Sequence, residues 1–498
     1  MASTSPAQGP EISGRLDLSP TELAEIRNHT EANGHGGASF ETIVTVCEIL
    51  ADVITIVLTL LFAYGIYRWL AVGQRITYPL SSVTGMACLF ALLVIGLLDR
   101  SGAYQAGNSL LRVRETERIL RASIQASLFA FALSYFTKYM LSRGVLAIAF
   151  VAVPLLLVIE KQLICEAVRV LHSRGYGVRK VIIYGAGLTG QRLFSALLRS
   201  PKLGLDPVAF VDDDRRLQNS RIFESSYRRP RYARVLPGPL TSKLIRELKA
   251  STVVIGMSSV GRNKFLEIAS EASAAGAAVS FVPYQLDPSM FWVDYADIDG
   301  LLVASIKPPS RQIHHQLIKK AFDFTASLLV LILTAPLFLI LAAIIRISSP
   351  GPAMFVQERV GLGGKVFRLY KFRTMYAAAG SYDYSPRDPR DPRITPIGRF
   401  LRRTSLDEVP QILNVLKGEM SLVGPRPEMP FIVSQYQALH RLRLTVTPGI
   451  TGLWQLSADR ASLIHENIEY DLYYIRNRCF FMDLAILLHT VVFAANGI

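Results

Sequence analysis

Four long apolar runs constrain the fold of this chain more than any other feature of its sequence. They lie near residues 50–70, 78–98, 122–142 and 144–164. Each is close to the roughly 20 residues that an α-helix needs to cross the hydrocarbon core of a bilayer. Backbone polar groups cannot stay unpaired in lipid, so such runs are expected to be helical. The sequence therefore predicts a bundle of four transmembrane helices within residues 43–170.

Composition agrees with a membrane protein. Hydrophobic residues make up 50% of the chain and charged residues 19%, which is too apolar for an ordinary soluble domain. A net charge of +15 is compatible with nucleic acid, anionic lipid or phosphate-bearing partners. Beside membrane spans it favours lipid and phosphate, and we expect no nucleic-acid partner. The four cysteines are scattered without a CxxC pair, which indicates neither a disulfide framework nor a zinc site.

Arginine distribution predicts the orientation of the four helices. The outer connections offer little beyond Arg68, Arg75 and Arg143, whereas the connection between the second and third runs is rich in arginine. Its arginines are Arg100, Arg112, Arg114, Arg118 and Arg121. The positive-inside rule then places both chain termini in the cytoplasm. Residues 1–42, which are polar and lack apolar periodicity, are expected to be a disordered cytoplasmic tail.

An α/β pattern begins near residue 177. A short apolar strand at 180–184 leads into GAGLTG at 185–190, and a second strand at 207–211 ends at Asp212. Strand, GxGxxG turn, helix and acidic strand end are typical of a dinucleotide fold. Further strands are expected at 252–256, 278–282 and 301–304, which gives a cytoplasmic Rossmann-like domain over 177–306.

The glycine motif leaves two interpretations open. Gly185, Gly187, Gly190 and Asp212 are candidate nucleotide-binding residues, but the same glycines also serve to turn tightly and to pack a helix on a strand. A short-chain dehydrogenase would need Tyr-x-x-x-Lys on a later helix. The one match of this kind, at 176–180, runs into the first strand, which disfavours an oxidoreductase.

A fifth apolar run lies near 319–347 and contains Pro336. A straight helix of this length could cross the membrane, but proline removes a backbone hydrogen bond and kinks a helix. Basic residues occur at both ends, among them Lys319, Lys320 and Arg346. Charge counting therefore favours a re-entrant helix with both ends on the cytoplasmic face. A hairpin is expected to follow, with strands at 356–363 and 370–375, and His314 and His315 are expected in the preceding linker.

Residues 405–411 read SLDEVPQ and place two adjacent carboxylates, Asp407 and Glu408, among arginines. Ser405 and Glu408 fit a capping box, but Pro410 would then fall inside the helix. We therefore expect the helix to begin near Pro410, with both carboxylates at its mouth. Carboxylates beside so many guanidinium groups indicate phosphate chemistry.

The last third of the chain closely resembles the bacterial sugar transferase family, the monotopic polyprenyl-phosphate phosphoglycosyl transferases. The resemblance covers residues 310–498 and rests on separate blocks in the same order. Besides the kinked apolar run, these are QERVG at 357–361, KFRTM at 371–375, DPRIT at 391–395, LRRTSLDEVPQ at 401–411, GPRP at 424–427, PGITGLWQ at 448–455 and YDLYY at 470–474. The preceding helices and α/β domain resemble the long form of this family.

This resemblance implies a monotopic α+β catalytic domain with a re-entrant helix, in the inner membrane of a bacterium. It implies transfer of hexose-1-phosphate from UDP-glucose or UDP-galactose to undecaprenyl phosphate, with release of UMP, as the first step of exopolysaccharide, O-antigen or capsule synthesis. Asp407 would be the nucleophile that carries a covalent phosphosugar, and Glu408 would hold the required Mg²⁺. The implied phosphate contacts are Arg402, Arg426, Lys371 and Arg373. A homodimer is implied by the long form.

One departure from the family pattern concerns the loop after Trp454. Members usually continue WQVSGR, whereas this chain has Ala458 and Asp459 in the corresponding stretch, which leaves the loop shape open. Two alternative functions also remain at this point. One is an NAD-dependent sugar-nucleotide dehydratase or epimerase built on 177–306, and the other is a non-catalytic scaffold of a polysaccharide assembly complex.

Overall fold

The computed structural model describes residues 37–495 with eleven gaps. The gaps are residues 71–77, 105–111, 137–142, 200–202, 225–230, 258–260, 282–292, 299–300, 307–312, 377–390 and 457–467, with side chains left out at a few further positions. Predictions for the tail before residue 37, the 307–312 linker and the loop with Ala458 and Asp459 lie outside the described residues. Contacts group the chain into two compact units, Met1–Ala51 with Glu160–Leu286 and Asp52–Ile159 with Asp287–Ile498.

The N-terminal part contains the expected apolar helices. They are α2 Gly37–Leu70, α3 Leu80–Arg100, α4 Arg112–Phe136 and α5 Arg143–Ser173. Within the described residues, five helices are long and apolar enough to cross a membrane, by length and composition: these four and Gln316–Ser348. Helix α2 begins at Gly37, so the predicted tail of residues 1–42 extended too far.

Helix α4 corrects a second boundary, because it begins ten residues before the predicted start at residue 122. Four arginines that were assigned to a loop therefore lie on a helix. They are Arg112, Arg114, Arg118 and Arg121. Protein contacts make this arrangement tolerable: Arg118 Nη1 donates to the Gly102 carbonyl over 3.0 Å, and Arg121 pairs with the buried Glu117 carboxylate. The orientation deduced from a basic loop thus stays a prediction.

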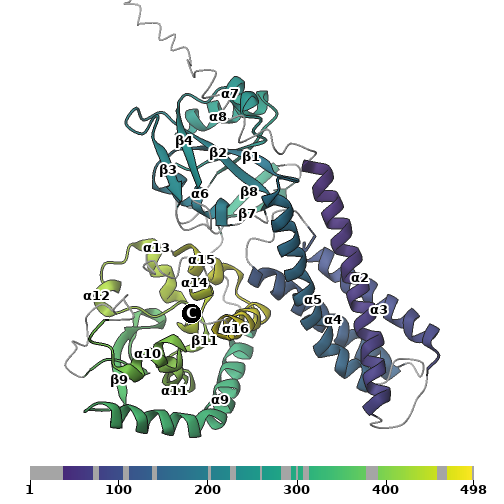
Figure 1. Cartoon of the computed structure of the whole chain (residues 1–498), viewed down its shortest axis with the longest axis vertical. Coiled ribbons are helices and arrows are strands. Elements are labelled where there is room, and N and C mark those ends of the chain that lie inside the picture. The colour runs from purple at the N-terminus through teal and green to yellow at the C-terminus, as the bar shows by residue number, and fades with distance from the viewer. Residues whose placement is uncertain are drawn as a thin grey trace, which may run out of the picture. The chain divides into compact units, whose positions relative to one another are not determined.

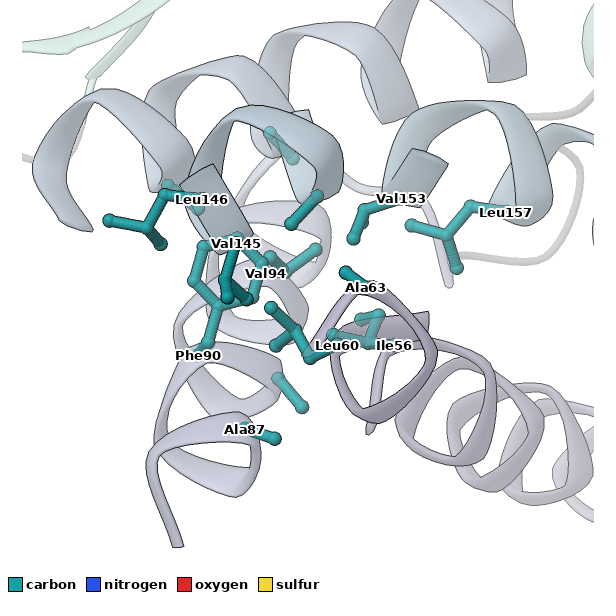
Figure 2. Packing of buried hydrophobic residues seen from close by; sticks show 14 of the residues in the cluster. Ile56, Leu60, Ala63, Ala87, Phe90, Val94, Val145, Leu146, Val153 and Leu157 are labelled. Atoms are coloured by element: carbon teal, nitrogen blue, oxygen red, sulfur yellow. The ribbon is translucent and has the colours of Figure 1, made fainter. Parts of the chain in front are cut away.

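Figure 2 shows how α2, α3 and α5 pack through small and branched side chains. Leu60, Val94 and Leu157 are fully buried there. On the opposite helix faces Leu58, Leu89 and Val151 are more than half exposed in the protein alone, at 58%, 67% and 64%. A helix that is apolar on both its packed and its exposed face is suited to lipid surroundings.

The α/β unit contains a six-stranded sheet in the order β3-β4-β2-β1-β5-β6. All its neighbouring strands are parallel except β3, which runs antiparallel to β4. Its strands are β1 Arg179–Tyr184, β2 Leu205–Asp212, β3 Arg221–Glu224, β4 Arg231–Pro237, β5 Thr252–Ile255 and β6 Ala278–Phe281. One sheet face is covered by α6 Leu188–Arg199 and the other by α7 Ser242–Glu247 and α8 Arg262–Ala274. This is a doubly wound, Rossmann-like arrangement.

Two differences from the predicted sheet stand out. Strands β3 and β4 had not been predicted, because their arginines interrupt the apolar pattern of a buried strand. The predicted strand at 301–304 exists as β8 Leu301–Ile306, but it pairs with β7 Val293–Ile298 in a separate two-stranded sheet. Its apolar residues alone could not indicate which sheet it joins.

The C-terminal part combines one long helix with short elements. The expected hairpin is confirmed as β9 Met354–Val360 antiparallel to β10 Val366–Phe372, and a second small sheet joins β11 Ser421–Val423 to β12 Gly449–Thr451 in parallel. The helical elements are α9 Ile313–Ser348, η4 Leu362–Gly364, α10 Pro396–Arg403, η5 Leu406–Gln411, α11 Ile412–Leu416, α12 Pro430–Val433, α13 Ala438–Arg441, η6 Leu442–Thr445, α14 Leu453–Leu456, α15 Ile468–Asn477 and α16 Phe480–Ala495.

Helix α9 is continuous over 36 residues with Pro336 inside it, and Figure 1 shows that it changes direction along its length. Its C-terminal half packs through Leu341 and Ile345 against Phe372 of β10 and Leu401 of α10. This packing attaches a membrane-type helix to the elements that carry the candidate site. His314 and His315 lie in the first turn of α9, not in a linker.

Candidate active site

The two adjacent carboxylates lie in a short 3₁₀ helix. This helix, η5, begins at Leu406, and α11 follows from Ile412. The α-helix thus begins close to the predicted start near Pro410, but the 3₁₀ helix that precedes it and contains both carboxylates was not predicted. The Ser405 side chain makes no capping hydrogen bond, in line with the rejection of a capping box. Ser405 has a φ of 55°, a left-handed conformation that costs a serine about 1 kcal/mol or more and often occurs at functional sites.

Glu408 is held by two cations. Lys371 Nζ lies 2.7 Å and Arg426 Nη2 lies 2.8 Å from the same oxygen, Glu408 Oε1. Burial opposes ionisation of this carboxyl group, but the charges of Arg426 and Lys371 outweigh it and hold the pKa of Glu408 well below its usual range. Glu408 is therefore a permanently ionised side chain in a cationic setting.

Asp407 differs from its neighbour in both contacts and charge. Burial raises the pKa of Asp407 to about 6, although Lys371, Arg402 and Arg426 partly oppose the shift. No described residue hydrogen-bonds its carboxylate. At neutral pH the group is ionised, yet it lacks the stabilising partners that Glu408 has. Two adjacent carboxylates in such different surroundings are suited to different roles.

The remaining cations come from separate elements. Lys371 lies in β10, Arg402 in the last turn of α10, and Arg426 in the segment after β11. Arg402 Nε donates to Thr374 Oγ1 over 2.9 Å. This hydrogen bond fixes the Arg402 side chain to the segment that follows β10. Burial lowers the pKa of the Lys371 ammonium, and Glu408 opposes that shift. The structure thus brings five of the six predicted catalytic-domain residues together.

Arg373 is the exception. Its buried guanidinium donates to the carbonyls of Ser349 and Pro350, over 2.7 Å in each case, so it closes the C-terminal end of α9. It had been predicted to contact phosphate because the block KFRTM, which is part of the family resemblance, contains two positive charges, Lys371 and Arg373. Strand β10 ends at Phe372, so Arg373 lies beyond the strand that carries Lys371.

Arg359 is a site neighbour to which the sequence assigned no role, although it lies in the QERVG block. Its Nη1 donates to the Pro427 carbonyl over 3.4 Å and its Nη2 to Gln357 Oε1 over 2.7 Å. Burial, together with the charge of Arg426, lowers the pKa of Arg359 to about 10. Arg359 therefore adds positive potential beside Arg426.

The glycine motif of the Rossmann-like domain has structural explanations of its own. Gly185 has a φ of +105°, and a Cβ at Gly190 would lie 1.9 Å from the Gly185 carbonyl oxygen. Asp212 Oδ2 accepts a hydrogen bond from the Ala186 amide over 2.6 Å, whereas a Cβ at Gly187 would meet open space. Turning and packing account for Gly185 and Gly190, and nucleotide binding by this loop stays a prediction.

A protein-built metal cage is absent from the part of the chain that the structure describes, where no three His, Cys, Asp or Glu side chains gather for a metal. Mg²⁺ commonly takes only one or two protein carboxylates together with substrate phosphates and waters. The donors Asp407 and Glu408 fit that type of site, and the ionised state of Glu408 suits a ligand of a hard cation.

Comparison with known proteins matches two families to this chain. The family described as bacterial sugar transferase matches residues 314–497, and the family described as CoA-binding domain matches residues 100–227. Among solved structures, UDP-D-quinovosamine 4-dehydrogenase from Vibrio fischeri covers 26% of this chain and 93% of its own at 21% identity. Its TM-score is 0.18, too low to support an argument.

Curated relatives extend the match into the N-terminal parts. UDP-glucose:undecaprenyl-phosphate glucose-1-phosphate transferase of Escherichia coli (strain K12) is 30% identical over 332 residues, 64% of this chain and 68% of the relative. Undecaprenyl-phosphate galactose phosphotransferase of Salmonella typhimurium is 30% identical over 410 residues, 77% of this chain and 82% of the relative. The family match and these two relatives together show that the chain belongs to the bacterial sugar transferase family.

Proposed function

We propose that this protein transfers hexose-1-phosphate from a UDP-hexose to undecaprenyl phosphate and releases UMP. The observation that carries the proposal is the pair Asp407 and Glu408, one carboxylate without a hydrogen-bond partner among the described residues and the other fixed by Lys371 and Arg426. Both relatives named above carry out a sugar-phosphate transfer to this lipid according to their names.

In the first step an Asp407 carboxylate oxygen attacks the phosphorus nearest the sugar. A bond forms between that oxygen and the phosphorus, and the bond to the bridging oxygen of the pyrophosphate breaks, so UMP leaves with the electron pair. Burial keeps the attacking carboxylate poorly solvated, which favours its reaction as a nucleophile. Arg402 and Arg426 supply guanidinium groups for the phosphate oxygens.

In the second step a phosphate oxygen of the lipid attacks the same phosphorus. The bond between the phosphorus and Asp407 breaks, the carboxylate is regenerated, and a lipid pyrophosphate sugar is formed. Splitting the transfer in two avoids a direct meeting of two anionic substrates. Exposed apolar residues of α9, such as Leu333 and Leu339 at 70% each, are suited to the lipid phase in which the acceptor resides.

Glu408 is the proposed ligand of Mg²⁺, with Asp407 beside it. When bound, this ion would neutralise charge on the pyrophosphate. Lys371 and Arg426 fix the orientation of the Glu408 carboxylate through two short contacts, so the ligand is held in place before substrate arrives.

The wider setting is also part of the proposal. Helix α9 would enter and leave the inner membrane on the cytoplasmic side, and residues 310–498 would form the catalytic domain there. In the chain this domain follows the transmembrane helices of 43–170 and the Rossmann-like domain of 177–306. The donor would be UDP-glucose or UDP-galactose, the two sugars that the names of the relatives contain. The product would start an exopolysaccharide, O-antigen or capsule, and the protein would be a homodimer.

The test is nucleotide release by the purified full-length protein with Mg²⁺, undecaprenyl phosphate and a panel of UDP-sugars. We expect UMP with one hexose and none with Asp407→Asn. Release of UDP would contradict the proposed bond cleavage. A change in nicotinamide absorbance with UDP-sugars would favour a dehydratase or epimerase, and unimpaired polysaccharide production by Asp407→Asn cells would favour a scaffold.

A further inference from the structure

A buried ionic cluster contacts the backbone of Arg426. It consists of Arg443 in η6, Glu428, Tyr436 and Asp471 in α15, each at most 8% exposed. The Arg443 guanidinium lies 3.2 Å from Glu428 Oε2 and 2.7 Å from Asp471 Oδ2. Burying charges costs desolvation free energy unless the charges are paired closely. We therefore looked for a function of this cluster that its charges could serve.

Arg443 also contacts the backbone of the site. Its Nη2 donates to the Arg426 carbonyl over 3.0 Å, and its Nη1 donates to the Tyr436 hydroxyl over 2.6 Å. The Tyr436 hydroxyl in turn donates to Glu428 Oε2. A single guanidinium therefore joins the carbonyl of one site residue to two buried carboxylates.

The rest of the segment around Arg426 is fixed in the same way. Pro425 and Pro427 restrict the backbone on either side of Arg426. Four further backbone contacts hold the segment: the Gly424 amide to the Thr451 carbonyl, the Gly449 amide to the Pro425 carbonyl, the Arg359 side chain to the Pro427 carbonyl and the Val360 amide to the Glu428 carbonyl. At Arg426 itself the carbonyl contact comes from Arg443.

We infer that Arg443 is a positioning residue, which holds the Arg426 backbone so that the Arg426 side chain meets Glu408 and the substrate phosphates. The inference rests on the proposed function, because the position of Arg426 matters only if that side chain acts on phosphate. Arginine suits the role because its planar fork presents donors in fixed directions. Lysine could pair with the two carboxylates, but it could not hold all three partners in that geometry.

Arg443→Lys therefore separates the two roles of this residue, since it keeps the buried charge and removes the fixed contact to the Arg426 carbonyl. UMP release is measured for the wild-type protein, Arg443→Lys, Arg426→Lys and the double variant, with Arg476→Lys as a control on an exposed arginine of α15. We expect Arg443→Lys to lower kcat about tenfold or more, since small displacements of positioning groups cost factors of this size. Arg476→Lys should match the wild type.

The coupling between the two arginines is the decisive result. If Arg443 acts through Arg426, Arg443→Lys should cost less than about threefold in the Arg426→Lys background, since interacting sites are non-additive. An equal fold-loss in both backgrounds, or Arg443→Lys within twofold of the wild type, would overturn the inference. If Arg443→Lys does not fold, Tyr436→Phe in the same two backgrounds provides the same comparison. No UMP from the wild type would instead overturn the proposed function.

Discussion

At the scale of single residues, the site depends on unequal treatment of two neighbours. Two cations contact one oxygen of Glu408, whereas Asp407 is half-buried among charges and receives no hydrogen bond from any described residue. The structure therefore stabilises the ionised form of Glu408 and destabilises that of Asp407. A nucleophile that the fold leaves unsatisfied is a known source of conflict between activity and stability.

Opposite effects on stability should follow from removing the two charges. The folded-state pKa of Asp407 is raised to about 6, so ionised Asp407 costs stability above pH 6, and Asp407→Asn should raise Tm there by about 1–3 °C. This gain should disappear below about pH 4, where the aspartate is protonated in both states. Glu408→Gln should lower Tm, because Lys371 and Arg426 lose their partner.

Thermal unfolding of the metal-free and substrate-free protein at pH 4, 6 and 8 checks this pair of changes. Lys365→Gln, an exposed change in the same domain, is the control and should leave Tm nearly constant. A lower Tm for Asp407→Asn at pH 8 would contradict the description of Asp407 as an unsatisfied carboxylate.

The sequence motifs identified most of the residues that the structure brings together at this site. Motif position predicted Asp407, Glu408, Lys371, Arg402 and Arg426, and the structure places these side chains around one site. Arg373 had been grouped with them for its positive charge, because the sequence does not show its contacts with the Ser349 and Pro350 carbonyls. Arg443 was not singled out at all, because its contact to the Arg426 carbonyl depends on how η6 and α15 fold around it.

At the scale of elements, α9 decides how the catalytic part meets the membrane. Its sequence predicted a kink from Pro336, and the helix bends along its length (Figure 1). A re-entrant α9 would have both of its ends on the same side of the membrane. An α9 that crosses the membrane would have its ends on opposite sides.

Re-entry predicts that cysteines introduced at both ends of α9 react from the same side. Lys320→Cys and Ser348→Cys, each in a variant with its native cysteines replaced by serine, would be labelled with a membrane-impermeant maleimide. In inverted membrane vesicles both should react, and in intact spheroplasts neither should. Reaction of the two positions from opposite sides would mean that α9 crosses the membrane.

Helix α4 is the second element whose role exceeds its sequence pattern. Val113 and Leu120 of α4 share an apolar cluster with Met482 and Ile486 of α16, and Thr116 Oγ1 lies 2.9 Å from His489 Nε2. The arginines and glutamates of its first turns, which had indicated a loop, lie on a helix that packs on the catalytic part. Such long-range packing cannot be deduced from periodicity.

Leu120→Ala tests this packing. Removing a buried leucine side chain typically costs about 2–5 kcal/mol, so we expect a clearly lower Tm in detergent and a lower rate of UMP release. Leu128→Ala is the matched control, because it lies on the same helix and is 59% exposed. Equal effects of the two substitutions would show that the contact between α4 and α16 contributes nothing.

At the scale of the whole molecule, the sequence predicted three kinds of structure along one chain: apolar helices, a Rossmann-like sheet and an α+β part with an apolar helix. The observed elements follow one another in that order along the chain. Strands β3 and β4 were not predicted, because their arginines interrupt the apolar pattern of a buried strand. The separate pairing of β8 with β7 was not predicted either, because an apolar run does not indicate which sheet a strand joins.

The central claim is that Asp407 carries the phosphosugar between the two substrates. The most direct test is the intact mass of the protein after incubation with Mg²⁺ and the UDP-hexose that supports UMP release, without undecaprenyl phosphate. We predict a mass increase of one hexose phosphate, absent in Asp407→Asn and lost when undecaprenyl phosphate is added. UMP release that requires the lipid, with no mass increase under any condition, would contradict a covalent intermediate and indicate direct transfer between the substrates.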